Sequence, residues 1–291
     1  MTKLETAHKQ FIKKLEDEGK SKSTLVAYSK DIEQLNENLA KGGISQVIDI
    51  ELKHLEDFMK KLANENYTLK SISRKTNATK TFFKFLQETG QIKDNVANLL
   101  KHPKVEIRAP RILSKLEYRA LRDAARDDTR TYTMIEVLLQ TGATISELSE
   151  IKLEQISTKD ETGSLFVPKK NNKEARNIPL NKAVVEAIRK YTETERPKME
   201  KAEYLLITKT GKPLLVRNIR STLNRYFKLA GVEKATVNDL RHTFVAHHLA
   251  SGVSILQLSK IAGHKRISTT ERYLQYIERP TTEEKSELGV L

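Results

Sequence analysis

Residues 101–113 of this 291-residue chain, KHPKVEIRAPRIL, interrupt a sequence in which helical spacing dominates. The segment holds two prolines and four Lys or Arg residues, and its apolar positions follow no helical period. Proline removes a backbone donor and clashes with the preceding turn, so this segment reads as an extended linker. We therefore expect two domains, at residues 1–100 and 113–291, joined by a linker at 101–112.

Helix starts are marked by a repeated local pattern, in which a Ser or Thr precedes an acidic residue by three positions. This spacing forms a capping box, which satisfies the free amides of a helix's first turn. The pairs are Ser114 and Glu117, Thr144 and Glu147, Thr236 and Asp239, and Ser268 and Glu271. The last pair predicts a helix that carries Tyr273 in its first or second turn, where a lone tyrosine is most often a core residue.

The segment 69–86, LKSISRKTNATKTFFKFL, predicts an amphipathic helix in the first domain. At about 100° per residue, four of its basic residues fall on one arc of roughly 120°, opposite Phe82 and Phe83. These four residues are Lys70, Arg74, Lys80 and Lys84. No acidic residue occurs between Glu65 and Glu88, so the stripe indicates a negatively charged partner such as a DNA backbone. A solvated face is the alternative.

The overall charge also indicates a polyanionic partner, because the formal net charge is +14. Residues 1–100 hold 17 Lys or Arg and 14 Asp or Glu, against 35 and 24 in the rest of the chain. No run of about 18 apolar residues exists, so we expect no membrane span and a cytoplasmic protein.

No cofactor is expected. The chain has no cysteine and no Gly-rich phosphate loop, which excludes thiolate zinc sites and gives no sign of a bound nucleotide. His242 and His247 are five residues apart, about 140° around a helix, and so lack the spacing of a zinc-binding helix. We therefore predict no metal site.

The second domain is expected to be mostly helical with one β-hairpin, in GSLFVPKKNNKEARNIPL at 163–180. Residues 165–167 and 177–180 form the predicted strands around a polar turn. The predicted fold class is therefore mainly α with two domains, an N-terminal four-to-five-helix domain and a helical C-terminal domain with a small β-sheet.

Taken together, the chain resembles the tyrosine recombinases of the phage-integrase type, Xer-like proteins included. The resemblance rests on the helical run SISRKTNATKTFFKFLQETGQIKDN and then, in order, on TGATISEL (141–148), the hairpin lysine, NDLRHTF (238–244), AGH (262–264) and TTERY (269–273). The nine-residue step from His264 to Tyr273 matches the spacing of that family. It implies a SAM-like core-binding domain followed by a catalytic domain.

The resemblance also implies a site. Tyr273 would be the nucleophile that joins the enzyme to a DNA 3′ phosphate, without metal or ATP. Arg241 would clamp the phosphate oxygens, His264 would donate a hydrogen bond to them, and Lys170 would protonate the departing 5′ oxygen. Lys169 and Lys173 are rivals of Lys170, because an extra residue near Ala175 blurs the register. Tyr276 is a rival nucleophile one helical turn away.

Two positions depart from the family pattern. Thr144 stands where the family has an arginine, and Asn238 stands where it usually has His or Lys. The resemblance thus implies a site-specific DNA recombinase with a degenerate first-arginine position. A catalytically weakened or inactive DNA-binding accessory relative is the alternative, and a topoisomerase with the same chemistry is a third.

The partners implied by the resemblance are double-stranded DNA and further copies of the chain. We expect a homotetramer in the synaptic complex, a monomer when free, and association with the nucleoid when bound to DNA.

Overall fold

The computed structural model describes residues 2–106, 108–159, 161–170, 173–199 and 202–277. The chain divides into two compact units, Met1–Arg108 and Ala109–Leu291, at a point inside the predicted linker. Residues 101–106 and 108–114 form neither helix nor strand. None of the described helices is long and apolar enough to cross a lipid bilayer.

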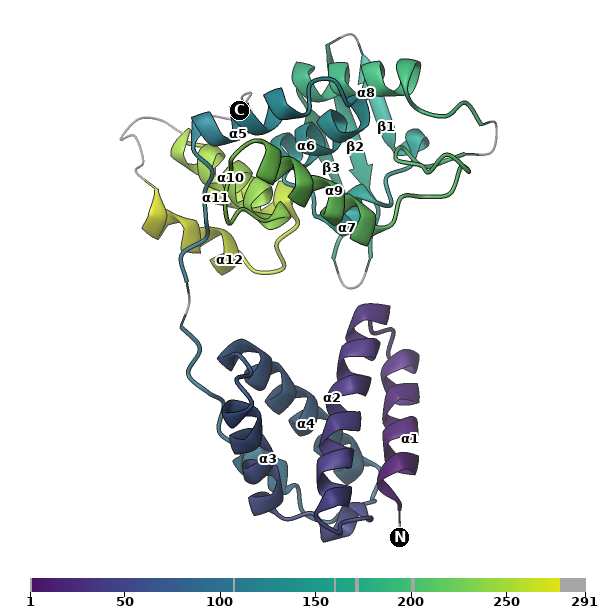
Figure 1. Cartoon of the computed structure of the whole chain (residues 1–291), viewed down its shortest axis with the longest axis vertical. Coiled ribbons are helices and arrows are strands. Elements are labelled where there is room, and N and C mark those ends of the chain that lie inside the picture. Colours follow the sequence, from purple (N-terminus) through teal and green to yellow (C-terminus); the bar gives the residue numbers. More distant parts are fainter. Residues whose placement is uncertain (1, 107, 160, 171–172, 200–201, 278–291) are drawn as a thin grey trace. The chain divides into compact units, whose positions relative to one another are not determined.

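Unit 1 is a bundle of helices (Figure 1, purple to blue). Its elements are α1 (Leu4–Asp17), α2 (Lys22–Lys41), a 3₁₀ turn η1 (Val47–Asp49), α3 (Leu52–Asn64), α4 (Leu69–Glu88) and a 3₁₀ turn η2 (Val96–Leu99). Phenylalanines from α1 and α4 meet at its centre, where the ring centroids of Phe11 and Phe82 are 5.2 Å apart. The predicted helical N-terminal domain is confirmed.

Unit 2 is mainly helical with one small sheet. Its first elements are α5 (Lys115–Ala124), α6 (Thr129–Thr141), α7 (Ile145–Leu148), a 3₁₀ turn η3 (Leu153–Gln155), β1 (Ile156–Lys159), β2 (Thr162–Val167) and β3 (Arg176–Leu180). The remaining elements are α8 (Lys182–Thr194), α9 (Val216–Leu229), α10 (Val237–Ala250), α11 (Ile255–Ala262), α12 (Ser268–Glu271) and a 3₁₀ turn η4 (Arg272–Tyr276). The predicted fold class is confirmed.

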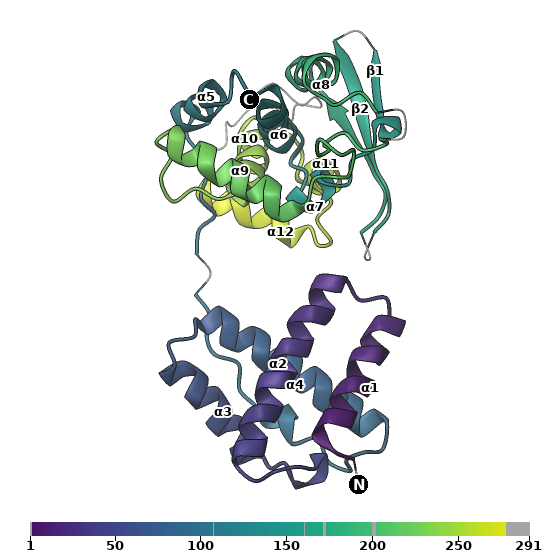
Figure 2. The same ribbon diagram turned by 45° about the vertical axis from the view of Figure 1, so that its right-hand side comes forward.

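The sheet contains the predicted hairpin. Strands β2 and β3 pair antiparallel, with Leu165 opposite Ile178 and Val167 opposite Arg176, and β1 joins the free edge of β2. Leu165 and Ile178 are buried toward α6 and α8, which lie beside the sheet in Figure 2. This packing fixes β3, and with it the direction in which Arg176 leaves the strand.

Two glycines with left-handed backbones lie where a neighbouring side chain approaches the main chain closely. Gly142 ends α6 with φ +62, and a Cβ there would lie 2.3 Å from a ring carbon of Phe244. Gly263 ends α11 with φ +67, and a Cβ there would lie 2.7 Å from the guanidinium carbon of Arg176. A side chain at either position would therefore push an aromatic ring or an arginine out of place.

Three of the four predicted capping boxes form, at Ser114, Thr144 and Thr236. The fourth prediction is wrong, because Ser268 is the first helical residue and Ile267, which precedes it, makes no side-chain cap. Ile267 already has α-helical dihedrals, and its carbonyl accepts the amide of Thr270 at 2.8 Å. A main-chain turn thus satisfies the amides that Ser268 was expected to cap.

Candidate active site

A polar cluster forms in unit 2 where α10, the end of α11 and η4 meet (Figure 1). Helix α10 supplies Arg241 and His242, the residue after the α11 cap is His264, and η4 supplies Tyr273. Three residues that were predicted from scattered motifs, Tyr273, Arg241 and His264, are therefore brought together.

Tyr273 combines a buried ring with a polar hydroxyl environment. Its side chain is 5% exposed and packs into the core of unit 2, while its hydroxyl lies 2.5 Å from Nδ1 of His242. Burial raises the pKa of Tyr273, and the positive charge of Arg241 opposes this shift. The ring is thus a core residue, as a lone tyrosine usually is, but its oxygen belongs to the charged cluster.

Arg241 is held by the end of α6. Its guanidinium donates a hydrogen bond to the carbonyl of Gly142, the residue whose left-handed backbone turns that carbonyl toward α10. Burial lowers the pKa of Arg241 and Glu147 opposes the shift, but an arginine stays protonated at any physiological pH. The cluster therefore contains a fixed positive charge.

His264 is kept neutral by its surroundings. Burial, reinforced by the positive charges of Arg241, Lys173 and Arg176, lowers the pKa of His264 to about 4. Its Nδ1 lies 2.7 Å from the hydroxyl oxygen of Thr270. When that hydroxyl donates to Nδ1, the ring proton lies on Nε2, from which the imidazole can donate to a phosphate oxygen.

Among the hairpin lysines, Lys173 is the one that joins the cluster. Its Nζ lies 3.4 Å from Glu147, its side chain is 32% exposed, and its charge acts on His264. Lys170, the first choice from sequence, is 56% exposed and pairs with Glu150, while Lys169 pairs with Glu174 at 3.0 Å. The register that the extra residue blurred thus favours Lys173.

The two departures from the family pattern lie at helix starts. Thr144 caps α7, and its own amide donates to Glu147 at 2.8 Å. Asn238 is exposed in the first turn of α10. Tyr276, the rival nucleophile, lines a different hollow with Tyr118 and His247.

Sequence reasoning missed two members of the cluster. The sequence pattern presents His242 only as a possible metal ligand, although it lies four residues after Asn238 and so shares its helix face. Arg176 was not considered, yet its Nη1 donates to Glu147 at 3.0 Å and its Nε donates to the carbonyl of Ile261 at 2.8 Å. The contacts of His242 and Arg176 within the cluster do not follow from any local sequence pattern.

A surface hollow with a volume of about 780 Å³ adjoins the cluster. Its ionisable lining residues are Lys173, Glu174, Arg176, Lys260, His264 and Lys265. Four of these six are Lys or Arg and one is acidic, so the hollow is suited to an anionic ligand such as a DNA phosphate.

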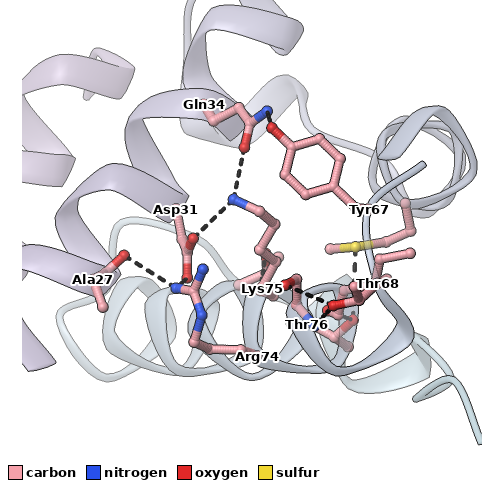
Figure 3. A network of polar contacts seen from close by, with 12 residues as sticks. Ala27, Asp31, Gln34, Tyr67, Thr68, Arg74, Lys75 and Thr76 are labelled. Atoms are coloured by element: carbon pink, nitrogen blue, oxygen red, sulfur yellow. Dashed lines mark hydrogen bonds and ion pairs between the residues drawn. The ribbon is translucent and has the colours of Figure 1, made fainter. Parts of the chain in front are cut away.

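The basic stripe on α4 carries less unpaired positive charge than its sequence indicated. Arg74 pairs with the buried Asp31 of α2 (Figure 3). The Nζ of Lys84 lies 3.7 Å from a carboxylate oxygen of Glu88. Carboxylates from outside the interval between Glu65 and Glu88 therefore neutralise part of the stripe at these two residues. Lys70 and Lys80 form no ion pair within the described residues, and Lys80 donates to the carbonyl of Asn98.

Behind the stripe lies a buried network that the sequence did not reveal (Figure 3). Lys75 is 7% exposed, and its Nζ donates to Asp31 at 2.8 Å and to Gln34 at 2.6 Å. Gln34 in turn donates to the hydroxyl of Tyr67 at 3.1 Å. Because Asp31 holds Arg74 as well, this network sets where the exposed guanidinium lies on α4.

A tyrosine hydroxyl grouped with an arginine and histidines in a mainly helical domain, preceded by a helical bundle, defines a protein of the tyrosine recombinase class. The sequence matches the Phage integrase family over residues 110–278 and the Phage integrase N-terminal SAM-like domain over residues 9–90. The chain therefore belongs to the phage integrase family.

Individual proteins give the same result. The chain is 30% identical over 279 residues to "Tyrosine recombinase XerC" of Staphylococcus saprophyticus, covering 94% of this chain and 92% of the relative. Two solved structures with similar folds are a lambda integrase (75–356) dimer bound to a COC′ core site and a lambda integrase tetramer bound to a Holliday junction. The first has a TM-score of 0.75 and 19% identity and covers 92% of this chain and 97% of the integrase chain. The second has a TM-score of 0.74 and 20% identity, and the match covers 92% of this chain and 79% of the integrase chain.

Proposed function

We propose that this chain is a site-specific DNA recombinase that cuts and rejoins DNA strands through a 3′-phosphotyrosyl intermediate. The observation that carries the proposal is the Tyr273 hydroxyl, which lies in one cluster with His242 and within the field of Arg241. Membership of the phage integrase family and the similarity to a XerC recombinase support the same function.

In the proposed reaction, the oxygen of Tyr273 forms a bond to the phosphorus while the bond from phosphorus to the 5′ oxygen breaks. A phenol with a pKa near 10 is a tolerable nucleophile and a good later leaving group. The phosphotyrosyl bond conserves the energy of the phosphodiester, so rejoining needs no nucleotide hydrolysis and, in this scheme, no metal.

The negative charge that develops on the phosphate requires fixed donors. Arg241 would bind two non-bridging oxygens, for which its planar guanidinium is suited. His264 would donate a hydrogen bond from Nε2, which its neutral state permits. We assign the general acid to Lys173 rather than Lys170, because Lys173 shares Glu147 with the cluster.

The choice of lysine is testable by substitution. Lys173→Ala is expected to slow strand cleavage by about 10²–10³-fold, because the 5′ oxygen then leaves without a proton. A substrate whose 5′ bridging oxygen is replaced by sulfur should restore the rate, since a thiolate with a pKa near 8.5 leaves unprotonated. The measurement is single-turnover cleavage of both substrates.

Lys170→Ala and Lys169→Ala are the matched controls on the same hairpin. Each should cleave both substrates within about threefold of the wild-type rate. A sulfur-dependent rescue of Lys170→Ala instead would return the role of general acid to Lys170.

Double-stranded DNA is the proposed substrate, and we propose that a core-binding domain at 1–100 and a catalytic domain at 113–291 both bind it. Lys70 and Lys80 would contact phosphates directly, whereas Arg74 and Lys84 would exchange carboxylates for phosphates. We propose a monomer when free and a tetramer during strand exchange, by analogy with the lambda integrase tetramer on a Holliday junction.

Thr144 favours a second function, that of a DNA-binding accessory relative with reduced or lost catalysis, because it replaces a cation with a capping residue. A nicked suicide substrate separates the two functions. It carries the DNA site that the chain selects from a random-sequence pool, and the recombinase should form a covalent adduct on it that survives detergent. Salt-sensitive binding without any adduct would contradict recombination and support the accessory function.

A further inference from the structure

His242 makes the closest contact to the proposed nucleophile among the described residues. Its Nδ1 lies 2.5 Å from the Tyr273 hydroxyl oxygen, and the two ring centroids are 5.8 Å apart. Since the phenol carries the proton of this pair at neutral pH, the hydroxyl donates and Nδ1 accepts. The bond joins α10 to η4, so it aligns the attacking oxygen as well as contacting its proton.

The charged and titratable groups around His242 come from three parts of the fold. Asp239 and Arg241 lie on its own helix α10, His264 follows α11, and Tyr273 belongs to η4. Burial lowers the pKa of His242, Arg241 adds to the shift, and Asp239 opposes it. The ring is therefore neutral at neutral pH and able to take a proton.

We propose that His242 is a catalytic residue, the general base that takes the phenolic proton as Tyr273 attacks the phosphate. The O–H bond of Tyr273 breaks and an N–H bond forms at Nδ1 of His242. In the same step the oxygen–phosphorus bond forms, and the departing 5′ oxygen takes a proton from Lys173. In religation the imidazolium returns its proton to the departing phenolate. This inference rests on the proposed function.

The position of His242 explains how the site can function with Asn238 where the family usually has His or Lys. A carboxamide has no basic lone pair that takes a proton near neutral pH, so Asn238 cannot be the base. His242 follows it by one turn on the same face of α10. The proton acceptor is therefore provided by the same helix, one turn further along.

The test is His242→Asn, whose side-chain oxygen can accept the hydrogen bond near the place of Nδ1 but cannot take the proton. Cleavage of the suicide substrate should slow by about 10²-fold at neutral pH, with DNA affinity unchanged. The wild-type rate should fall as the pH drops below 6.5, because a protonated His242 is no longer a base, and His242→Asn should lack this dependence. The titration of His264, near pH 4, lies below this range.

His247→Asn, on the same helix but facing the hollow beside Tyr276, is the control and should keep the wild-type profile. A His242→Asn variant that cleaves within about threefold of wild type, or a wild-type rate that stays flat from pH 7 down to the titration of His264, near pH 4, overturns the proposal. The flat profile decides the question even where the variant does not fold. Absence of any wild-type adduct overturns the recombinase function, and this proposal with it.

A second, independent observation concerns Arg176. Its side chain is 8% exposed, and its two terminal nitrogens each lie 3.0 Å from an oxygen of Glu147. Nη2 lies close to Oε2 of Glu147 but forms no hydrogen bond with it or with any other of the described residues. The amide of Thr144 donates to the same carboxylate, so one carboxylate separates Arg176 from the position that lacks the family's arginine.

We infer that Arg176 supplies the second fixed cation of the phosphate site in place of an arginine at 144. Glu147 does not cancel this charge, because Lys173 shares the same carboxylate, which leaves the three groups with a net positive charge. The charge of Arg176 acts on both His264 and Arg241. The inference rests on the proposed function and extends its electrostatics.

A methylphosphonate at the scissile position distinguishes this role from a structural one. Arg176→Gln, which keeps donors but no charge, should slow cleavage of the phosphodiester by about 10²-fold. On the neutral methylphosphonate the loss should be about tenfold smaller, since less charge needs neutralising. Adding Thr144→Arg to Arg176→Gln should recover at least about tenfold on the phosphodiester.

Arg196→Gln is the structural control, because Arg196 is also tied to main-chain carbonyls, those of Ala202, Tyr204 and Leu205. It should lower the melting temperature while keeping the wild-type ratio of rates on the two substrates. Equal losses on both substrates for Arg176→Gln, or no recovery with Thr144→Arg, would overturn the inference without affecting the recombinase function.

Discussion

Tyr273→Phe is expected to abolish the covalent protein–DNA adduct while leaving DNA binding intact. The substitution removes one oxygen, and no other described group in the cluster can form the ester bond at that place. The ring, which is 5% exposed, keeps its packing, and the lost hydrogen bond to His242 should cost only about 1 kcal/mol of stability. The measurements are adduct formation on the suicide substrate, DNA affinity and melting temperature.

Tyr276→Phe is the matched control, one helical turn away and facing a different hollow. It should form adduct at the wild-type rate. If Tyr276→Phe loses the adduct and Tyr273→Phe keeps it, the nine-residue spacing from His264 has identified the wrong tyrosine.

Arg241→Lys has the second largest expected effect, a loss of about 10²–10³-fold in the rate of cleavage. Lysine keeps the charge but presents a point donor in place of the planar fork that binds two phosphate oxygens. It also gives up the bond that the guanidinium donates to the Gly142 carbonyl. Single-turnover cleavage at saturating enzyme isolates this effect from DNA binding.

Arg220→Lys, an exposed arginine on α9, is the control and should cleave at the wild-type rate. A rate for Arg241→Lys within about tenfold of wild type would mean that charge alone suffices at this position. In that case the bidentate role proposed for Arg241 is wrong.

The helices and their starts were predictable because their causes are local. The capping boxes at Ser114, Thr144 and Thr236 use residues three positions apart, and the hairpin strands follow from alternation over a few residues. The exception at Ser268 arose because a main-chain turn at Ile267 already satisfied the amides. Local rules fail where a neighbouring turn performs the same task.

The α4 stripe shows why surface charge was harder to predict. The segment itself contains no acidic residue, yet Asp31 of α2 reaches Arg74 from 43 positions away. Lys75 leaves the surface altogether, since Asp31 and Gln34 satisfy its ammonium inside the bundle. Such pairings depend on how α2 packs against α4, which no periodicity within α4 encodes.

From the sequence alone one obtains the family, the two-domain order, the helical class and three residues of the cluster, because ordered motifs and short-range periodicity are properties of the chain itself. Only the folded chain decides that His242 contacts Tyr273, that Arg176 lies under Gly263 and that Lys173 rather than Lys170 faces Glu147. These contacts join residues 26 to 87 positions apart. They depend on the packing of α10, η4 and the hairpin, and therefore on the whole core of unit 2.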